Sequence, residues 1–223
     1  MTFSASIPSA PVGWRSRVVT RLTGAAASWF LFALSFALLY MSSSTVIGLG
    51  GFCASGGPYE IAVECPDSVV AFTPLSIFGG LIAVAIAVAL AQGFGTPLTT
   101  WAWPTLFCGL GFAFLGGFIS HQDITGLLIG IMFEIMGLVP LVLELRGSPQ
   151  RVLLGQYAAN GQQFYEGDKA RRSLMSPDSP NPSGAVPPTF THWIVGLGIP
   201  VIFGFVGVQV ALYLFRSVVA ASS

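Results

Sequence analysis

Residues 71–92 read AFTPLSIFGGLIAVAIAVALAQ, a stretch without a single charged side chain. A helix of about 20 apolar residues is long enough to cross the roughly 30 Å hydrocarbon core of a bilayer. A lone strand would leave its backbone groups unpaired in lipid, and a barrel strand would alternate apolar and polar residues. The stretch therefore predicts a transmembrane helix.

The rest of the chain contains further apolar stretches of similar length. Only 8 % of the 223 residues are charged, whereas a soluble domain carries about 25 %. The net charge is zero, so no overall field favours nucleic acid as a partner. The apolar segments lie at 25–47, 71–92, 101–120, 124–145 and 193–215. We predict an all-α polytopic membrane protein with about five transmembrane helices and the lipid bilayer as its solvent.

Two of these segments allow another interpretation. The apolar core of 101–120 is short after Pro104, and a re-entrant hairpin there would leave four spans. The first segment follows three arginines as a signal peptide would, but its apolar run exceeds the usual length of about 7–15 residues. We expect a retained helix. The predicted divisions are a tail at 1–24, a four-span bundle at 25–145 with an outer loop at 48–70, a loop at 146–192, a fifth span at 193–215 and a tail at 216–223.

The basic residues predict the orientation of the chain. With five spans and a cytoplasmic N-terminus, eight of the nine lysines and arginines lie inside, and Arg216 alone lies outside. Basic residues accumulate on the cytoplasmic side of membrane proteins. Trp29, Trp101, Trp103 and Trp193 fall near segment ends, where aromatic side chains form belts at the membrane surface. We expect the N-terminus inside and the C-terminus outside.

Small residues recur at four-residue or eight-residue spacing in several segments. Gly109 and Gly117 share a face of the third segment, and Gly126 and Gly130 share a face of the fourth. Helix association in lipid depends on close packing, which small residues allow. We expect these glycines to lie at helix contacts in a compact bundle that could also form oligomers.

Serine recurs every seven residues in the first segment, at Ser28, Ser35 and Ser42. Such a stripe could line a polar pathway, or its hydroxyl groups could make ordinary hydrogen bonds to the backbone and to other helices. We favour the ordinary hydrogen bonds.

Glu134 is the one acidic residue in the middle of a predicted span, on the same helix face as neighbouring glycines. An ionised acid at mid-span costs about 3 kcal/mol. We therefore expect a protonated group, hydrogen-bonded to Ser35 or Gln209, which is either a proton or cation site or a neutral structural contact. Pro140 further along leaves the carbonyl of Met136 without its usual intrahelical donor.

Cys53 and Cys65 lie in the predicted outer loop, separated by the turn signal Gly-Gly-Pro at 56–58. The compartment outside the cell is oxidising, so we expect a disulfide between them. No histidine lies within the loop, and we expect no metal site there. Cys108, in the middle of a span, is expected to be a buried and inert thiol.

The outer loop resembles that of small polytopic membrane proteins of actinobacteria, in the run Cys53-Ala-Ser-Gly-Gly-Pro-Tyr-Glu-Ile61 followed by Cys65-Pro66 and a new apolar segment. The resemblance covers the first two spans and the loop between them. It implies a plasma-membrane protein of a high-GC Gram-positive bacterium and brings no activity to particular residues.

The loop at 146–192 is polar, and five prolines lie in its second half at positions 177, 180, 182, 187 and 188. This composition predicts a flexible linker there, while residues 152–172 could form a short surface helix. A loop of this length either binds a partner or is disordered. The sequence leaves both open.

Motifs of the common enzyme classes are missing. The chain has no phosphate-binding GxxxxGK, no GxGxxG, no HExxH and no GxSxG. His121 and His192 have no partner at ligand spacing, so we expect no haem, metal or other cofactor. We predict a non-catalytic accessory, assembly or regulatory component of a membrane complex, which binds partners through its transmembrane faces or the loop at 146–192. The alternative is a small proton- or cation-linked transporter that uses Glu134; a membrane enzyme explains nothing that these two miss.

Overall fold

The computed structural model describes residues 14–48, 65–91, 95–122, 124–147, 149–154 and 190–222. Within these ranges the chain forms helices and no strand. The elements in chain order are α1 (Trp14–Gly48), α2 (Asp67–Ile86), the π-helical η1 (Ala87–Ala91), α3 (Leu98–His121), α4 (Ile124–Gly147), α5 (Pro149–Leu154) and α6 (Phe190–Ser222). Five helices of the described chain are long and apolar enough to cross a membrane. The prediction of an all-α, multi-pass membrane protein with five spans is confirmed.

The third span is one continuous helix. α3 begins after Pro97, contains Pro104 in its second turn and runs for 24 residues. It ends at Gln122, which has a left-handed backbone (φ 55°) and donates its N–H to the carbonyl of Phe118 at 2.7 Å. A left-handed residue after the last turn is a common helix stop. The four-span alternative with a re-entrant hairpin is therefore wrong.

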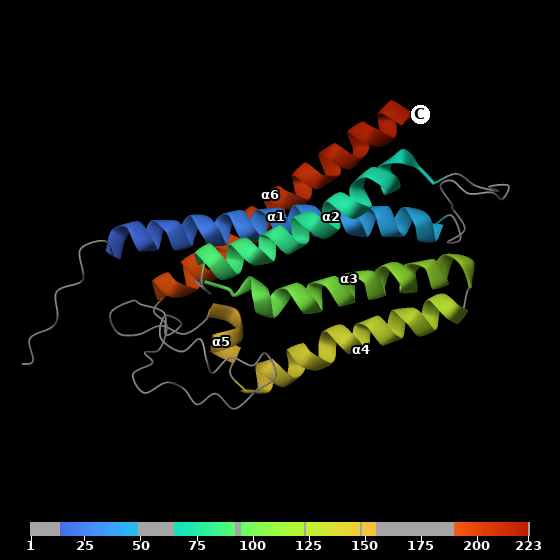
Figure 1. The fold of residues 1–223 in the computed structure, drawn as a ribbon. Coiled ribbons are helices and arrows are strands. Elements are labelled where there is room, and N and C mark those ends of the chain that lie inside the picture. The colour runs from blue at the N-terminus through green and yellow to red at the C-terminus, as the bar shows by residue number, and fades with distance from the viewer. Residues whose placement is uncertain are drawn as a thin grey trace, which may run out of the picture.

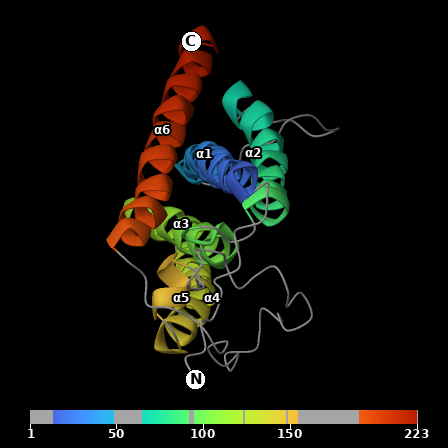
Figure 2. The same cartoon turned by 90° about the vertical axis from the view of Figure 1, so that its left-hand side faces the viewer.

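α1 lies at the centre of the bundle, with α2, α3 and α6 around it (Figure 2). One group of buried side chains, Leu38, Phe72 and Ala211, joins α1 to α2 and α6. α4 lies on the far side of α3 from α1 (Figure 1). Most of the other helices therefore pack against α1, the first helix of the sequence.

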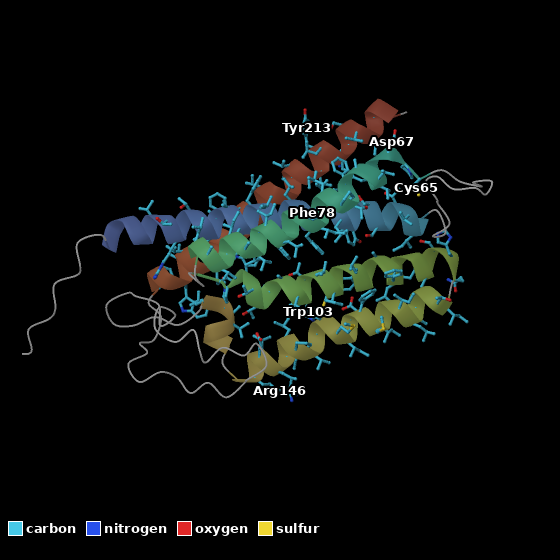
Figure 3. The ribbon with its side chains drawn as sticks, in the orientation of Figure 1. Cys65, Asp67, Phe78, Trp103, Arg146 and Tyr213 are labelled. Atoms are coloured by element: carbon cyan, nitrogen blue, oxygen red, sulfur yellow. The ribbon has the colours of Figure 1, made fainter. Side chains whose placement is uncertain are left out.

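Asp67 and Arg146 lie at opposite ends of the bundle. α1 begins at the end where α4 stops, which we call the N-terminal end, and Arg146 lies there; Cys65 and Asp67 lie at the opposite end (Figure 3). Asp67 is in the first turn of α2 and Arg146 in the last turn of α4. Both placements favour the helix dipole, because acidic groups stabilise helix starts and basic groups stabilise helix stops. The described ends of α1 and α6 lie at opposite ends of the bundle, as an odd number of spans requires (Figure 1).

Glycines bring other helices close to α1. A Cβ atom on Gly109 of α3 would overlap the ring of Phe36. On α6, a Cβ atom on Gly207 would overlap the carbonyl oxygen of Phe30 and lie 3.0 Å from the backbone nitrogen of Leu34. Small residues therefore set the distance between α1 and its neighbours, as expected where lipid offers no hydrophobic force between helices.

Candidate functional site

The serine stripe of α1 faces the interior of the bundle. Ser28, Ser35 and Ser42 are 1 %, 3 % and 1 % exposed. The Ser28 hydroxyl donates to the carbonyl of Ala25 at 2.9 Å, and the Ser35 hydroxyl lies directly against Gly79 of α2. Ser42 Oγ has no hydrogen-bond partner in the described part of the chain. Two of the three serines thus pack against their own backbone or a neighbouring helix.

The Glu134 carboxyl group lies on the backbone of α3. A Cβ atom placed on Gly111 of α3 would be 2.7 Å from Glu134 Oε1 and 3.0 Å from its carboxyl carbon. The thiol of Cys108, one turn earlier on α3, donates a hydrogen bond to Glu134. Glu134 Oε1 is buried and has no hydrogen-bond partner among the residues that the structure describes. The contact between α3 and α4 therefore holds a carboxyl group and a thiol side by side, with one carboxyl oxygen unused.

In the structure Glu134 does not lie beside either of its expected hydrogen-bond partners, Ser35 and Gln209. Ser35 is on α1 and faces α2, whereas Gln209 is exposed on α6. Glu134 and Gly130 are four residues apart and share the face of α4 that packs on α3. A Cβ atom on Gly130 would lie 2.8 Å from the side chain of Leu115 on α3. The three predicted polar residues do not form one site.

The remaining glycines predicted to lie at helix contacts are on α3 and α4. Gly117 of α3 lies against the side chain of Ile47 of α1. Gly126 of α4 is buried. Gly137 of α4, one turn beyond Glu134, lies against Cys108, whose sulfur would be 2.6 Å from a Cβ atom there. The absence of side chains at Gly111 and Gly137 is what lets the carboxyl group and the thiol approach the opposite backbone.

Pro140 frees a carbonyl group, and another helix uses it. Proline has no N–H, so the carbonyl four residues earlier in α4, that of Met136, has no intrahelical donor. The indole N–H of Trp103 on α3 donates to this carbonyl at 3.1 Å; Figure 3 shows Trp103 between the two helices. The pair gives α3 and α4 a polar contact on the same side of the bundle as Glu134.

Pro200 has the same effect in α6, where it frees the carbonyl of Gly196. Thr96, just before α3, donates to that carbonyl from its backbone N–H at 3.4 Å and from its hydroxyl at 3.0 Å. The Thr96 hydroxyl is also 2.7 Å from the carbonyl of Leu153 in α5, and its own carbonyl accepts the indole N–H of Trp29 at 3.0 Å. Thr96 is not among the site residues predicted from the sequence, although Pro200 indicates that the carbonyl of Gly196, four residues earlier, needs a donor.

Three tryptophans predicted to form membrane-surface belts have internal hydrogen-bond partners. Trp29 and Trp103 donate to the carbonyls described above. Trp101 donates to the carbonyl of Val152 in α5 at 3.0 Å. These indole groups connect elements of the protein to one another, a role that their position near segment ends does not reveal.

Other predicted features lie partly outside the described residues. Cys53 is outside them, so its disulfide with Cys65 stays a prediction, and Cys108 is a free thiol. Of the expected surface helix at 152–172, only the first residues are described. They belong to α5, in which Val152 is 2 % exposed, so this part of the loop packs against the bundle.

Within the described ranges no group of three or more His, Cys, Asp and Glu residues is placed to hold a metal ion.

Comparison of the chain with protein-family models, with curated proteins and with solved structures found no match. The resemblance of the outer loop to actinobacterial membrane proteins therefore stays a prediction.

Proposed function

We propose that this chain is a non-catalytic accessory or assembly component of a plasma-membrane complex, with its N-terminus in the cytoplasm. The observation that carries the proposal is that a helix, α1, occupies the centre of the bundle. Its contacts with α2, α3 and α6 are close enough that a Cβ atom on Gly79, Gly109 or Gly207 would overlap an atom of α1. Transporters bind their substrates near the bilayer midplane, between parts of the fold that move against one another, whereas these close contacts hold α1 to its three neighbours.

Glycines on the outward faces of three spans support a partner-binding role. Among the residues that the structure describes, nothing lies within 4 Å of a Cβ atom placed on Gly80 of α2, Gly116 of α3 or Gly198 of α6. Glycine in a helix interior costs about 1 kcal/mol relative to alanine, and packing against the described residues does not require it at these positions. A transmembrane helix of another protein, or of a second copy, would gain close approach there.

The test is purification of the tagged chain from its native membranes in mild detergent. We expect a second protein at fixed stoichiometry, or a stable homo-oligomer. Gly80→Leu, Gly116→Leu and Gly198→Leu should leave the chain folded because the added side chain meets open space, and at least one of them should release the partner. Val88→Leu is the matched control, an enlargement at a position that is 60 % exposed. A monomer that purifies alone, with all four variants indistinguishable from it, would refute the proposal.

A second candidate function is proton- or cation-linked transport, favoured by the buried and unpartnered Oε1 of Glu134. Reconstitution into liposomes tests it, with a proton or sodium gradient as the driving force. Glu134→Gln preserves shape and hydrogen bonding but cannot titrate, and Glu134→Leu removes the polar group. A gradient-dependent flux that Glu134→Gln abolishes would establish this function. If no flux occurs and only Glu134→Leu is destabilised, the residue is structural.

A further inference from the structure

The short helix α5 is embedded in the N-terminal end of the bundle. Val152 is 2 % exposed and Leu154 is fully buried. Two backbone carbonyls of α5 accept hydrogen bonds from outside it, that of Val152 from the Trp101 indole and that of Leu153 from the Thr96 hydroxyl. A helix of six residues has little stability of its own, so these contacts hold α5 in place.

The Thr96 hydroxyl group connects α5 to α6. It has one proton and lies within hydrogen-bond distance of two carbonyl oxygens, that of Leu153 at 2.7 Å and that of Gly196 at 3.0 Å. Gly196 also lies against α5 directly, since a Cβ atom there would be 2.6 Å from Leu154 Cδ2. The same Cβ atom would be 3.7 Å from the Cα atom of Gly95, which has a positive φ of 68°. α5, the turn before α3 and the start of α6 therefore form one packed unit.

The packing partners of α6 differ in part on the two sides of Pro200. Before the proline, Gly196 packs against α5 and the Thr96 turn, and Val195 and Ile199 pack with residues of α1 and η1. After it, Gly207 and Ala211 pack against α1. Proline removes one hydrogen bond from the helix ladder and is a common place for a helix to bend. The part of α6 before Pro200 therefore has α5 and the Thr96 turn as neighbours in addition to α1.

We propose that α5 is a latch that sets the position of the first turns of α6. With α5 docked, Thr96 holds both the Leu153 and the Gly196 carbonyls, and α6 lies against the Thr96 turn. With α5 released, the segment of α6 before Pro200 loses the contacts of Gly196 with α5 and is held by Val195 and Ile199, so it can bend about that proline, while the segment beyond it stays on α1. This coupling is a property of the chain itself and does not depend on the proposed function.

Hydrogen exchange measured by mass spectrometry on the purified full chain in lipid nanodiscs tests the latch. Thr96→Val keeps the shape of the side chain and removes the hydroxyl. We expect the amides of α5 and those of 193–199 to exchange at the same rate, about five-fold faster than in the wild type. This factor is the one expected when a single hydrogen bond is lost. The amides of 204–215 should be unchanged. Thr99→Val is the matched control, since Thr99 is exposed one turn away.

Pro200→Ala separates the coupling from general loosening. Alanine supplies an intrahelical N–H for the Gly196 carbonyl, so in this background Thr96→Val should still loosen α5 but leave 193–199 protected. If Thr96→Val does not fold, the wild type decides the matter: the two segments should share one opening rate, faster than that of 204–215. Faster exchange of α5 alone, or equal protection along all of α6, overturns the proposal.

Discussion

Trp103→Phe in α3 tests whether another helix satisfies the carbonyl that a proline frees. The substitution removes the N–H that donates to the Met136 carbonyl at 3.1 Å and keeps an aromatic ring in place. Pro140→Ala in α4 gives the same carbonyl an intrahelical donor, which makes the indole N–H dispensable. The two substitutions form a double-mutant cycle, because they act on the same acceptor from opposite sides.

The expected magnitudes follow from the contacts of the indole ring. Hydrogen bonds between transmembrane helices average about 0.6 kcal/mol. The ring also packs on Phe107, with centroids 4.2 Å apart, and exchange of indole for benzyl weakens this pair by about 0.5 kcal/mol. Trp103→Phe should therefore lower the free energy of unfolding by about 1 kcal/mol in the wild type. In the Pro140→Ala background only the packing loss remains, so the coupling energy is about 0.6 kcal/mol.

Equilibrium unfolding in mixed SDS micelles measures the four proteins of the cycle under one condition. Near-ultraviolet circular dichroism follows tertiary structure, because unfolding changes the environment of the aromatic rings. An equal cost of Trp103→Phe with and without Pro140 would show that the indole N–H contributes nothing through this carbonyl, and the reasoning would fail.

The remaining predictions concern packing, covalent structure and topology. Gly207→Ala should lower the free energy of unfolding by about 1–3 kcal/mol, because the added methyl group meets the backbone of α1; Gly80→Ala, in open space, should instead be neutral or stabilising by up to about 1 kcal/mol in the same SDS titration. Cys53 and Cys65 should appear as one linked peptide in non-reducing mapping, with stabilisation of roughly 3 kcal/mol on the loop-entropy estimate; recovery of both as alkylated thiols from native membranes would contradict this. Reporter fusions after Ser223 and in the loop between α5 and α6 should report opposite sides of the membrane, and equal signals would show that the number or direction of the spans is wrong.

The five spans could be predicted from the sequence because the length of an apolar stretch is a property of each segment alone. The sequence also identified the freed carbonyl of Met136, since the effect of Pro140 is local to one helix. The donor could not be predicted. Trp103 belongs to another helix, and the register between two helices depends on how their side chains interlock.

Glu134 shows the same limit on the candidate site. Its four-residue spacing from Gly130 correctly indicated a helix face that packs against another helix. The pattern does not say which helix, and the expected partners on α1 and α6 gave way to Gly111 and Cys108 on α3. Likewise, the sequence predicted a surface helix where α5 is buried at the end of the bundle. A short run of apolar residues looks the same in both places.

The central position of α1 has a consequence for how the protein is made. α1 ends at Gly48 and α6 begins at Phe190, so about 140 residues separate the first span from the last. At roughly 5–20 residues per second, the ribosome needs roughly 7 to 30 s to deliver α6 after α1 has left the exit tunnel. During this interval the face of α1 that later receives Gly207 is in contact with lipid or with the insertion machinery. A chain truncated before α6 keeps that face uncovered, which makes it a natural target for membrane quality control.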